Sequence, residues 1–408
     1  MASDELIDVR KRIAKYSVEE LNATADAYFE RLDNWDYLLA KPLAQIGEAP
    51  ELLQCFAHVV EGLQLVPDMT VLDFGAGACW TSRFLTQLGM QVIALDVSVS
   101  ALRIGEALYG RLPVIGQQPR ARFLAFDGRR IDLPDATVDR IACWEAFHHV
   151  PNTADVLKEM FRVLKPGGIA GFSEPGPTHS RAPQSQAEMR NYRVIENDIV
   201  VEDIWKDAHA AGFADIRIAA FAARVPLLSL EEFSRLVDAG DKQAGQHVLD
   251  AVRDYLAGRR LFFLYKPGRA ADADSRRRTG LDAELSATLA PGTSVNLLRV
   301  NVKIRNSGTA TWLGKSARVG AVHVGVHLHD PDRVLITHGY HVHYGVGGDD
   351  PEAPIKPGDV RQIEFEMPAP APGRYVFEID LVSAGVAWFG ECGVTPVRIA
   401  TSVPIGDA

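Results

Sequence analysis

Seven short apolar runs alternate with amphipathic, helix-like stretches between residues 70 and 265. The runs lack the polar alternation of a strand with one wet face, which predicts a parallel sheet covered by helices on both sides. Ligands of such sheets bind beyond the carboxyl ends of the strands. The runs are Thr70–Phe74, Gln91–Asp96, Arg122–Asp127, Arg140–Trp144, Gly168–Ser173, Asp215–Phe221 and Leu261–Tyr265, and clear helical stretches are Ser98–Tyr109 and Thr153–Leu164.

The pattern changes near residue 268 and divides the chain. Short strands with alternating apolar and polar residues, broken by Pro and Gly, follow a polar, charged stretch and predict an all-β sandwich. We therefore expect an N-terminal helical cap, a first domain with a helical insertion, a linker and a sandwich domain. Their expected limits are 1–60 for the cap, 61–268 for the first domain, 227–258 for its insertion, 269–280 for the linker and 281–408 for the sandwich. The insertion is large enough to form a wall of a substrate pocket.

Length, charge and cysteine usage agree with a two-domain cytoplasmic protein. The chain has 408 residues, 47% of them hydrophobic, and a net charge of −10. This charge argues against a nucleic-acid partner, and no apolar run is long enough for a membrane span. The four cysteines lie far apart without a paired motif, and the acidic N-terminus does not resemble a signal peptide.

A glycine turn directly follows the first apolar run. Residues 71–77 read Val-Leu-Asp-Phe-Gly-Ala-Gly, so Asp73 precedes two glycines, Gly75 and Gly77. Glycines in a strand-to-helix turn let a ligand approach the backbone amides closely. Asp96 ends the second run about 20 residues later, the spacing at which an acidic side chain meets ribose hydroxyls. Asp127 and Gly128 end the third run.

These features, in this order, resemble the class I S-adenosylmethionine-dependent methyltransferases over residues 69–221. The turn Lys165-Pro-Gly-Gly168 fits the same pattern, and Leu261–Tyr265 is similar to the family's antiparallel seventh strand. The resemblance implies a Rossmann-like seven-stranded sheet with helices on both faces, and S-adenosylmethionine as cofactor. The cofactor-binding residues that it implies are Asp73, Gly75, Gly77, Asp96, Asp127 and Gly128.

Two residues after the glycine turn depart from known patterns. The family often has a third glycine where this chain has Cys79, whose bulk could tilt the helix start or cover the cofactor. A nicotinamide-binding Rossmann domain would need a glycine where this chain has Trp80. The methyltransferase interpretation is therefore favoured over the dinucleotide one.

Candidate catalytic residues follow the fourth and fifth runs. Methyl transfer needs mainly orientation, but a hydroxyl acceptor must also lose a proton, and histidine suits that step near neutral pH. We expect His148 or His149 to face the pocket, although one could cap a helix and the other pack against it. Further candidates are Glu145, which could touch the cofactor or only bind loop amides; Glu174 and His179 as reserve bases; and Tyr192 and Arg193 as acceptor contacts or a solvated helix face. Tyr28, Trp35 and Tyr37 could form a lid or be ordinary core aromatics.

The second domain suggests the acceptor. The segment Asn306-Ser-Gly-Thr-Ala-Thr-Trp312 loosely resembles turns of immunoglobulin-type sandwiches on bacterial glycan-modifying and glycan-export proteins, with Trp312 pinning two sheets together. We therefore expect O-methylation of a sugar, nucleotide-sugar or polysaccharide hydroxyl. The alternatives are N- or C-methylation of a small natural product or quinone-like acceptor, and a glycan-binding or assembly protein on a methyltransferase platform.

Histidines crowd one predicted hairpin of the second domain. His323, His327 and His329 share one strand face. With a three-residue loop, His341 and His343 would join that face and His338 would leave it, whereas a two-residue loop or a bulge would reverse this assignment. Three converging ligands are not evident, so we predict no metal site and favour a polar face or a platform for sugars.

Overall fold

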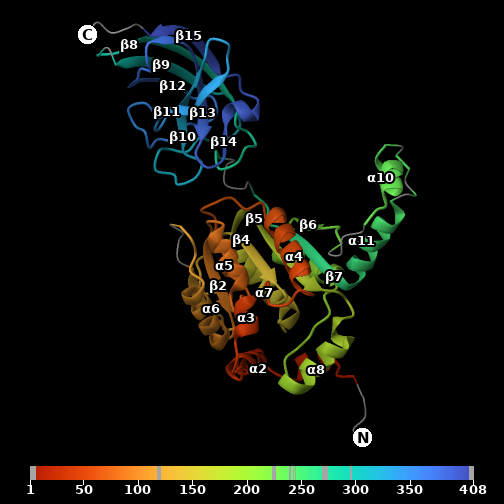
Figure 1. Ribbon diagram of the computed structural model, residues 1–408. Coiled ribbons are helices and arrows are strands. Elements are labelled where there is room, and N and C mark those ends of the chain that lie inside the picture. The colour runs from red at the N-terminus through yellow and green to blue at the C-terminus, as the bar shows by residue number, and fades with distance from the viewer. Residues whose placement is uncertain are drawn as a thin grey trace. The chain divides into compact units, whose positions relative to one another are not determined.

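The chain folds into two units, residues 1–270 and 271–408 (Figure 1). The computed structural model describes residues 6–116, 121–222, 227–238, 240–241, 243, 245–268, 274–294 and 296–403. Within this part of the chain, no helix is both long and apolar enough to cross a membrane.

The first unit contains a seven-stranded sheet with the order β3-β2-β1-β4-β5-β7-β6. The first five strands are parallel, and β7 is antiparallel to both β5 and β6. This confirms the expected antiparallel seventh strand. The strands are β1 (Thr70–Phe74), β2 (Gln91–Asp96), β3 (Arg122–Ala125), β4 (Val138–Trp144), β5 (Leu164–Pro175), β6 (Asp215–Ile218) and β7 (Arg259–Tyr265).

Helices cover both faces of the sheet, as the apolar runs predict. Val71 packs in one core cluster with residues of α4 and α5, whereas Leu72, the next residue of β1, packs with residues of α7 and α9 on the other face. This alternation of side chains explains why the strands are apolar throughout. The helices are α4 (Ala49–Gly62), α5 (Trp80–Gln87) and α6 (Val99–Arg111) on the first face, and α7 (Thr153–Val163) and α9 (Val201–Ala211) on the second.

Three short helices precede α4, and a further helix lies between β5 and α9. Helix α2 begins after Ser17, whose side chain forms a capping box with Glu20. Helix α2 lies close to α6, with which it shares hydrogen bonds through Asp26 and Ser98. The N-terminal helices are α1 (Val9–Lys15), α2 (Val18–Glu30) and α3 (Asp36–Ala40), and the later helix is α8 (Pro183–Tyr192).

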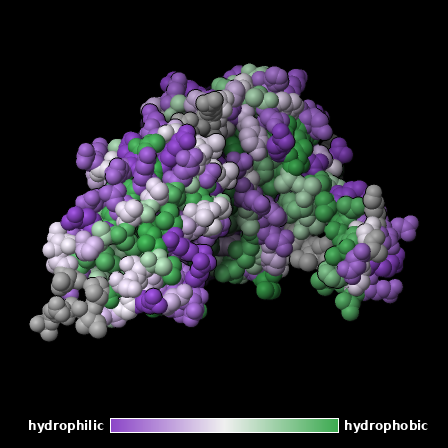
Figure 2. All heavy atoms as spheres, turned by 90° about the horizontal axis from the view of Figure 1, so that it is seen from above, coloured by the Kyte–Doolittle hydropathy of each residue, from purple (hydrophilic) through white to green (hydrophobic). Residues whose placement is uncertain are grey.

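The expected helical insertion is an exposed arm. It consists of α10 (Leu230–Val237) and α11 (Gln246–Gly258), and neither helix has a buried residue. Figure 2 shows hydrophobic atoms on the projection at the right, where Figure 1 draws these helices. Exposed apolar side chains there include Leu230, Phe233 and Leu249.

The second unit is a β-sandwich, as predicted. One sheet has the order β11-β10-β13-β14, with β15 also paired to β13, and the other has the order β12-β9-β8. Trp312 is fully buried between them and packs edge-on against Phe389. The strands are β8 (Ala283–Pro291), β9 (Leu297–Asn306), β10 (Val322–His329), β11 (Leu335–His343), β12 (Val360–Pro368), β13 (Gly373–Ser383), β14 (Ala387–Trp388) and β15 (Val397–Val403).

Part of the expected linker belongs to this sandwich. Residues 269–273 lie outside the described residues, but Ser275 is fully buried, and its hydroxyl donates to the carbonyl oxygen of Gly320 at 2.6 Å. The Ser383 hydroxyl donates to the Ser275 carbonyl at 2.6 Å. A small polar residue that reads as linker in the sequence is thus a buried hydrogen-bonding group.

The register of β10 and β11 contains a bulge and separates the histidines into two groups. His343 pairs with Val324 and His341 with Val326, so both lie with the valine face and stack on Phe365. The expectation for a three-residue loop is therefore wrong, and the bulged alternative holds. His338 instead contacts His327, whose Nδ1 accepts a hydrogen bond from the Gly339 amide at 2.9 Å.

Candidate functional site

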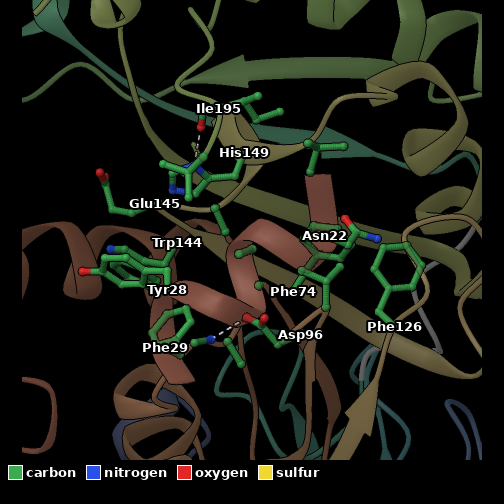
Figure 3. Close-up of a pocket in the computed structure, with 18 of the residues that line it drawn as sticks. Asn22, Tyr28, Phe29, Phe74, Asp96, Phe126, Trp144, Glu145, His149 and Ile195 are labelled. Atoms are coloured by element: carbon green, nitrogen blue, oxygen red, sulfur yellow. Dashed lines mark hydrogen bonds between the residues drawn. The ribbon is translucent and has the colours of Figure 1, made fainter. Parts of the chain in front are cut away.

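A cavity of about 300 Å³ lies at the carboxyl ends of β1, β2 and β4. This volume is at the lower end of the range for small-molecule sites, about 300–1,000 Å³. Figure 3 shows Asp96 on one side of the cavity and His149 and Glu145 on the opposite side. Its walls come from the glycine turn, the ends of β2 and β4, the N-terminal helices and the segment after α8.

The glycine turn forms the floor of this cavity. Gly75 and Gly77 both have positive φ, +68° and +51°, a conformation that favours glycine. A Cβ on Gly75 would lie 2.2 Å from Cβ of Ala146, whereas a Cβ on Gly77 would meet only the Phe29 ring at 4.0 Å. Gly75 therefore permits close packing of the β1 and β4 ends, and Gly77 leaves its backbone open to a ligand.

Asp96 lines the cavity and holds the turn in place. Its Oδ2 accepts a hydrogen bond from the Gly77 amide at 2.8 Å, and its Oδ1 accepts one from the Ser98 amide at 2.8 Å. Burial raises the pKa of Asp96 to about 6. Each carboxylate oxygen retains a lone pair for a ligand hydroxyl.

Asp73 lies below the cavity and does not line it. Its Oδ2 accepts hydrogen bonds from the hydroxyls of Thr81 and Ser82, at 2.6 and 2.5 Å. Its Oδ1 is buried and has no hydrogen-bond partner among the described residues. Burial raises the pKa of Asp73 to about 6. Because Asp73 is 1% exposed and does not line the cavity, its role is to support the turn and the start of α5 rather than to contact a ligand.

The two residues after β3 lie differently from one another. Gly128 lines the cavity, whereas the Asp127 carboxylate is exposed and accepts hydrogen bonds from the amides of Arg129 and Arg130. The side chain that approaches this end of the cavity is Asn152, whose Nδ2 donates to the Gly128 carbonyl at 3.0 Å. Asn152 Oδ1 is buried and has no partner among the described residues, so it is available to an amine.

Helix α2 forms the wall opposite the glycine turn. Asn22 Nδ2 donates to the Asp127 carbonyl at 3.0 Å, and a Cβ on Gly128 would lie 2.4 Å from the same nitrogen. Tyr28 and Phe29 line the cavity and contact each other edge to face. Of the three aromatics considered for a lid, only Tyr28 lines the cavity. Trp35 packs against the α3 and α6 region, and Tyr37 donates to Glu48.

Cys79 takes the left-handed conformation that a third glycine would adopt. Its φ is +62°, and the side chain is fully buried. A Cβ on Gly105 of α6 would lie 2.3 Å from its Sγ, so that glycine makes the space for the thiol. Cys79 therefore packs away from the cavity. Trp80 lines the cavity, in contact with Phe56 and Trp144.

His149 is the histidine that faces the cavity. Its Nδ1 lies 2.7 Å from the carbonyl oxygen of Ile195, so Nδ1 carries the proton and Nε2 is free (Figure 3). About 40% of its side chain is exposed, and this part faces the cavity. Desolvation, with the charge of His148 as the second cause, lowers the pKa of His149 to about 4.

His148 lies behind His149 and is buried. Its Nδ1 lies 2.7 Å from Oε2 of Glu174. Burial opposes protonation of His148, but the hydrogen bond and charge of Glu174 outweigh it and raise the pKa. Glu174 also accepts hydrogen bonds from the amides of Ala146 and Phe147, so it fixes the loop after β4 rather than reaching the cavity.

The remaining candidates lie around the same wall. Glu145 lines the cavity and pairs with Arg259 at 2.5 Å. His179 is behind the wall, with Nε2 2.7 Å from Oε2 of Glu196. Tyr192 packs edge-on against Tyr28, and Arg193 ends α8 with a positive φ of +64°. Neither Tyr192 nor Arg193 is among the cavity-lining residues.

Sequence reasoning missed two charged residues here. Lys41 lines the cavity, and Glu196 lies beneath His149. Glu188, at the start of the strip that ends in Tyr192 and Arg193 and was expected as a possible acceptor wall, also lines the cavity. Burial lowers the pKa of Lys41. A signal for Glu196 was the short polar run Glu196-Asn197-Asp198 between apolar residues on both sides. Such flanks indicate burial, and a carboxylate is rarely buried without a partner.

The described residues fit S-adenosylmethionine. The open backbone at Gly77 and the Asp96 carboxylate suit its ribose end, and Asn152 Oδ1 suits its adenine amine. The unpartnered Nε1 of Trp144 suits its carboxylate group, whereas Asp73 lies below the cavity and does not line it. The site therefore offers hydrogen-bond acceptors to the ribose and adenine groups and a hydrogen-bond donor to the carboxylate group.

Comparisons with known proteins agree with this assignment. Residues 72–172 match a family model described as a methyltransferase domain. A demethylmenaquinone methyltransferase from Streptomyces griseus is 28% identical over 158 residues, which are 38% of this chain and 64% of that enzyme. An erythromycin 3''-O-methyltransferase from Saccharopolyspora erythraea is 28% identical over 224 residues, 51% of this chain and 70% of that enzyme.

This chain spans less than two thirds of the Streptomyces enzyme's length. Among solved structures, an S-adenosylmethionine-dependent methyltransferase from Mesorhizobium loti is matched with 17% identity and a TM-score of 0.39. That match covers 54% of this chain and 100% of that one. The sheet order with an antiparallel β7, the glycine turn with Asp96 and the matched family model together place the first unit among the class I S-adenosylmethionine-dependent methyltransferase domains.

Proposed function

We propose that this protein is an S-adenosylmethionine-dependent O-methyltransferase whose acceptor is a hydroxyl of a small polar molecule, with a sugar hydroxyl as the first candidate. The observation that carries the proposal is the placement of His149. Its free Nε2 faces the same cavity as Gly77 and Asp96, on the opposite side.

The cofactor would supply a sulfonium-bound methyl group that is already activated for in-line displacement. The chain's own task is then to hold the acceptor oxygen in line and to receive its proton. Nε2 of His149 is suited to that proton because Nδ1 is committed to the Ile195 carbonyl. Residues of helix α2 line the cavity that holds the glycine turn and would limit the access of water to a bound cofactor.

The charged groups of the cavity support a polar acceptor. Four polar side chains line the cavity together with His149: Lys41, Glu145, Glu188 and Tyr28. Such groups can bind several hydroxyls of one ligand. The relative named for erythromycin 3''-O-methylation matches this chain over a longer stretch than the demethylmenaquinone enzyme does. Both observations favour a hydroxylated acceptor.

A quinone-like acceptor is the second candidate. It is supported by the relatives named for demethylmenaquinone and ubiquinone methylation and by the exposed apolar residues of α10 and α11. The described residues of this arm do not line the cavity, however, so the geometry of the site favours the polar acceptor.

A panel assay tests both. The full chain is incubated with S-adenosylmethionine and, separately, sugars, nucleotide-sugars, polysaccharide, a quinol and an amine, and products are read by mass spectrometry. Methylation of hydroxyl oxygen in the sugar set is expected. Methylation of the quinol alone would replace the first candidate by the second, and failure to bind S-adenosylmethionine in calorimetry would overturn the enzyme proposal.

Composition also bears on partners and location. The net charge of −10 supports a function without nucleic acid. All four cysteines are free thiols, and three of them are buried, which supports a reducing compartment such as the cytoplasm.

A further inference from the structure

A cluster of histidine and carboxylate groups lies in the wall beneath the acceptor side of the cavity. His148, His149 and Glu196 each offer a ligand atom within 4.8 Å of the others. His148 Nε2 lies 3.6 Å from Oε2 of Glu196, and His149 Nδ1 lies 3.6 Å from Oε1 of the same residue. In a tetrahedral zinc site with bonds of about 2.0–2.1 Å, ligand atoms lie about 3.3 Å apart. The distance between His148 Nε2 and Glu196 Oε2 is close to this value. For His149 the distance of 3.6 Å is to Nδ1 and shows only that the ring lies beside the Glu196 carboxylate.

Both imidazoles are held in the way that metal-binding histidines are held. His148 Nδ1 contacts the Glu174 carboxylate, and His149 Nδ1 contacts the Ile195 carbonyl oxygen, each at 2.7 Å. Metal-ligating histidines nearly always donate their other ring N–H to a carboxylate or a backbone carbonyl. In both residues this arrangement leaves Nε2 as the coordinating atom.

Glu196 lacks the partners that a buried carboxylate normally has. It is 2% exposed, and its Oε1 has no hydrogen-bond partner among the described residues. The ion pairs described for Glu174 and Glu196 are all with histidines, and none is with Lys or Arg. His179 contacts Oε2 of Glu196 at 2.7 Å and orients it. Two buried carboxylates in one wall therefore have no permanent positive charge beside them.

We propose that His148 Nε2, His149 Nε2 and Glu196 bind one divalent cation of the zinc class. Two imidazoles and one carboxylate favour zinc or cobalt over magnesium or calcium, which prefer all-oxygen sites. Because His149 lines the cavity, the fourth coordination position is open to it, as in catalytic rather than structural zinc sites. The cation site stands on these contacts alone. With the cation bound, Nε2 of His149 would be a ligand and could not also receive the acceptor's proton. The cation would instead lower the pKa of the bound hydroxyl, whose proton would leave to solvent, and this use of the site rests on the proposed function.

Metal binding to the full, untagged chain tests the site. The protein is treated with a chelator, dialysed, and titrated with Zn²⁺ by calorimetry and with Co²⁺ by visible absorption. We expect one ion per chain and the intense visible bands of four-coordinate cobalt. E196Q keeps the size of the side chain but loses its charge, so its affinity should fall by at least about 100-fold. His323→Gln, in the second unit, is the matched control and should bind as the wild type does.

Cofactor titration of the same samples separates loss of metal from loss of fold. E196Q should bind S-adenosylmethionine like the wild type, and if it does not, His148→Gln replaces it in the comparison. Absence of stoichiometric Zn²⁺ binding to the wild type, or wild-type affinity in the variant, would overturn the site. Metal binding without methylation of any acceptor would leave the site standing and overturn the proposed function instead.

Discussion

The backbone amide of Gly77 donates a hydrogen bond to Oδ2 of Asp96 at 2.8 Å. This bond joins the turn after β1 to the end of β2. The acidic residue therefore has a structural role in addition to the ribose contact that its position suggests, because it holds the turn in the open shape that a ligand needs.

Replacing Asp96 by Ala should weaken S-adenosylmethionine binding by at least about 10-fold. The variant loses both the ligand contact and the acceptor of the Gly77 and Ser98 amides, and an unpaired buried donor costs about 1–3 kcal/mol. Calorimetric titration measures the affinity, and denaturant unfolding measures the stability. Unchanged affinity in D96A would contradict the ribose assignment.

Asp73→Asn should change how stability depends on pH. Burial raises the folded-state pKa of Asp73 to about 6, from about 3.8 for an Asp in water. Between these values the folded chain holds a proton that the unfolded chain has lost, so this group's contribution to stability is lost as pH rises. A shift of about 2 units corresponds to up to about 3 kcal/mol. The stability of D73N relative to wild type should therefore rise by up to that amount from pH 4 to pH 8 in denaturant unfolding.

The same variant should bind the cofactor less tightly. Oδ2 of Asp73 accepts hydrogen bonds from the Thr81 and Ser82 hydroxyls at the start of α5. Asn offers one acceptor oxygen instead of two and no charge, so we expect the start of α5, beside the glycine turn, to be held less firmly. If the stability difference between D73N and wild type did not change with pH, the raised pKa of Asp73 would be contradicted. If the variant also bound the cofactor like the wild type, Asp73 would have no role in the site.

His149→Ala should lower kcat by about 10²–10⁴-fold while leaving the affinity for S-adenosylmethionine nearly unchanged. This is the range for loss of a group that moves a proton in the transition state. Turnover with the acceptor found in the panel assay is the measurement. His247→Ala, a change to a half-exposed histidine of the arm, is the control. Equal activity of H149A and wild type would remove this histidine from the mechanism.

Gly128→Ala should loosen the helix that covers the cavity. Gly128 has φ of +85°, and a Cβ would lie 2.4 Å from Asn22 Nδ2 and 2.7 Å from Val18 Cγ1. We expect weaker cofactor binding and faster proteolysis before residue 30. Gly110→Ala is the matched control because a Cβ there meets nothing within 4 Å, and alanine favours its helix by up to about 1 kcal/mol. If the two variants had the same cofactor affinity and the same rate of proteolysis, the contact between Gly128 and α2 would not affect the cavity.

The sheet could be predicted from sequence because each strand is marked by residues that are neighbours along the chain. β1 and β2 have the expected bounds, since apolar runs that are buried on both faces stand out from the polar turns beside them. Asp96 and the glycine turn could be placed together for the same reason, because their spacing along one βαβ unit fixes their distance in space.

Other parts of the site depend on contacts between distant segments. Asn22 and Lys41 line the cavity from helices that precede the sheet, and no local pattern marks them. Asp127 carries the expected residue type, but its carboxylate is occupied by the amides of its own loop. The faces of His341 and His343 depended on the two register shifts between Val326 and His329 of β10, which no sequence pattern marks.

Helix α2 is tied to the ends of two strands, through Asn22 to the Asp127 carbonyl and through Asp26 to Ser98. A chain that began after residue 30 would keep every strand of the sheet and both of its large core clusters. It would nevertheless hold its methyl donor in an open trough instead of a closed chamber. We therefore expect the first thirty residues to slow release of the cofactor, so a change there would alter turnover without changing any residue proposed to react.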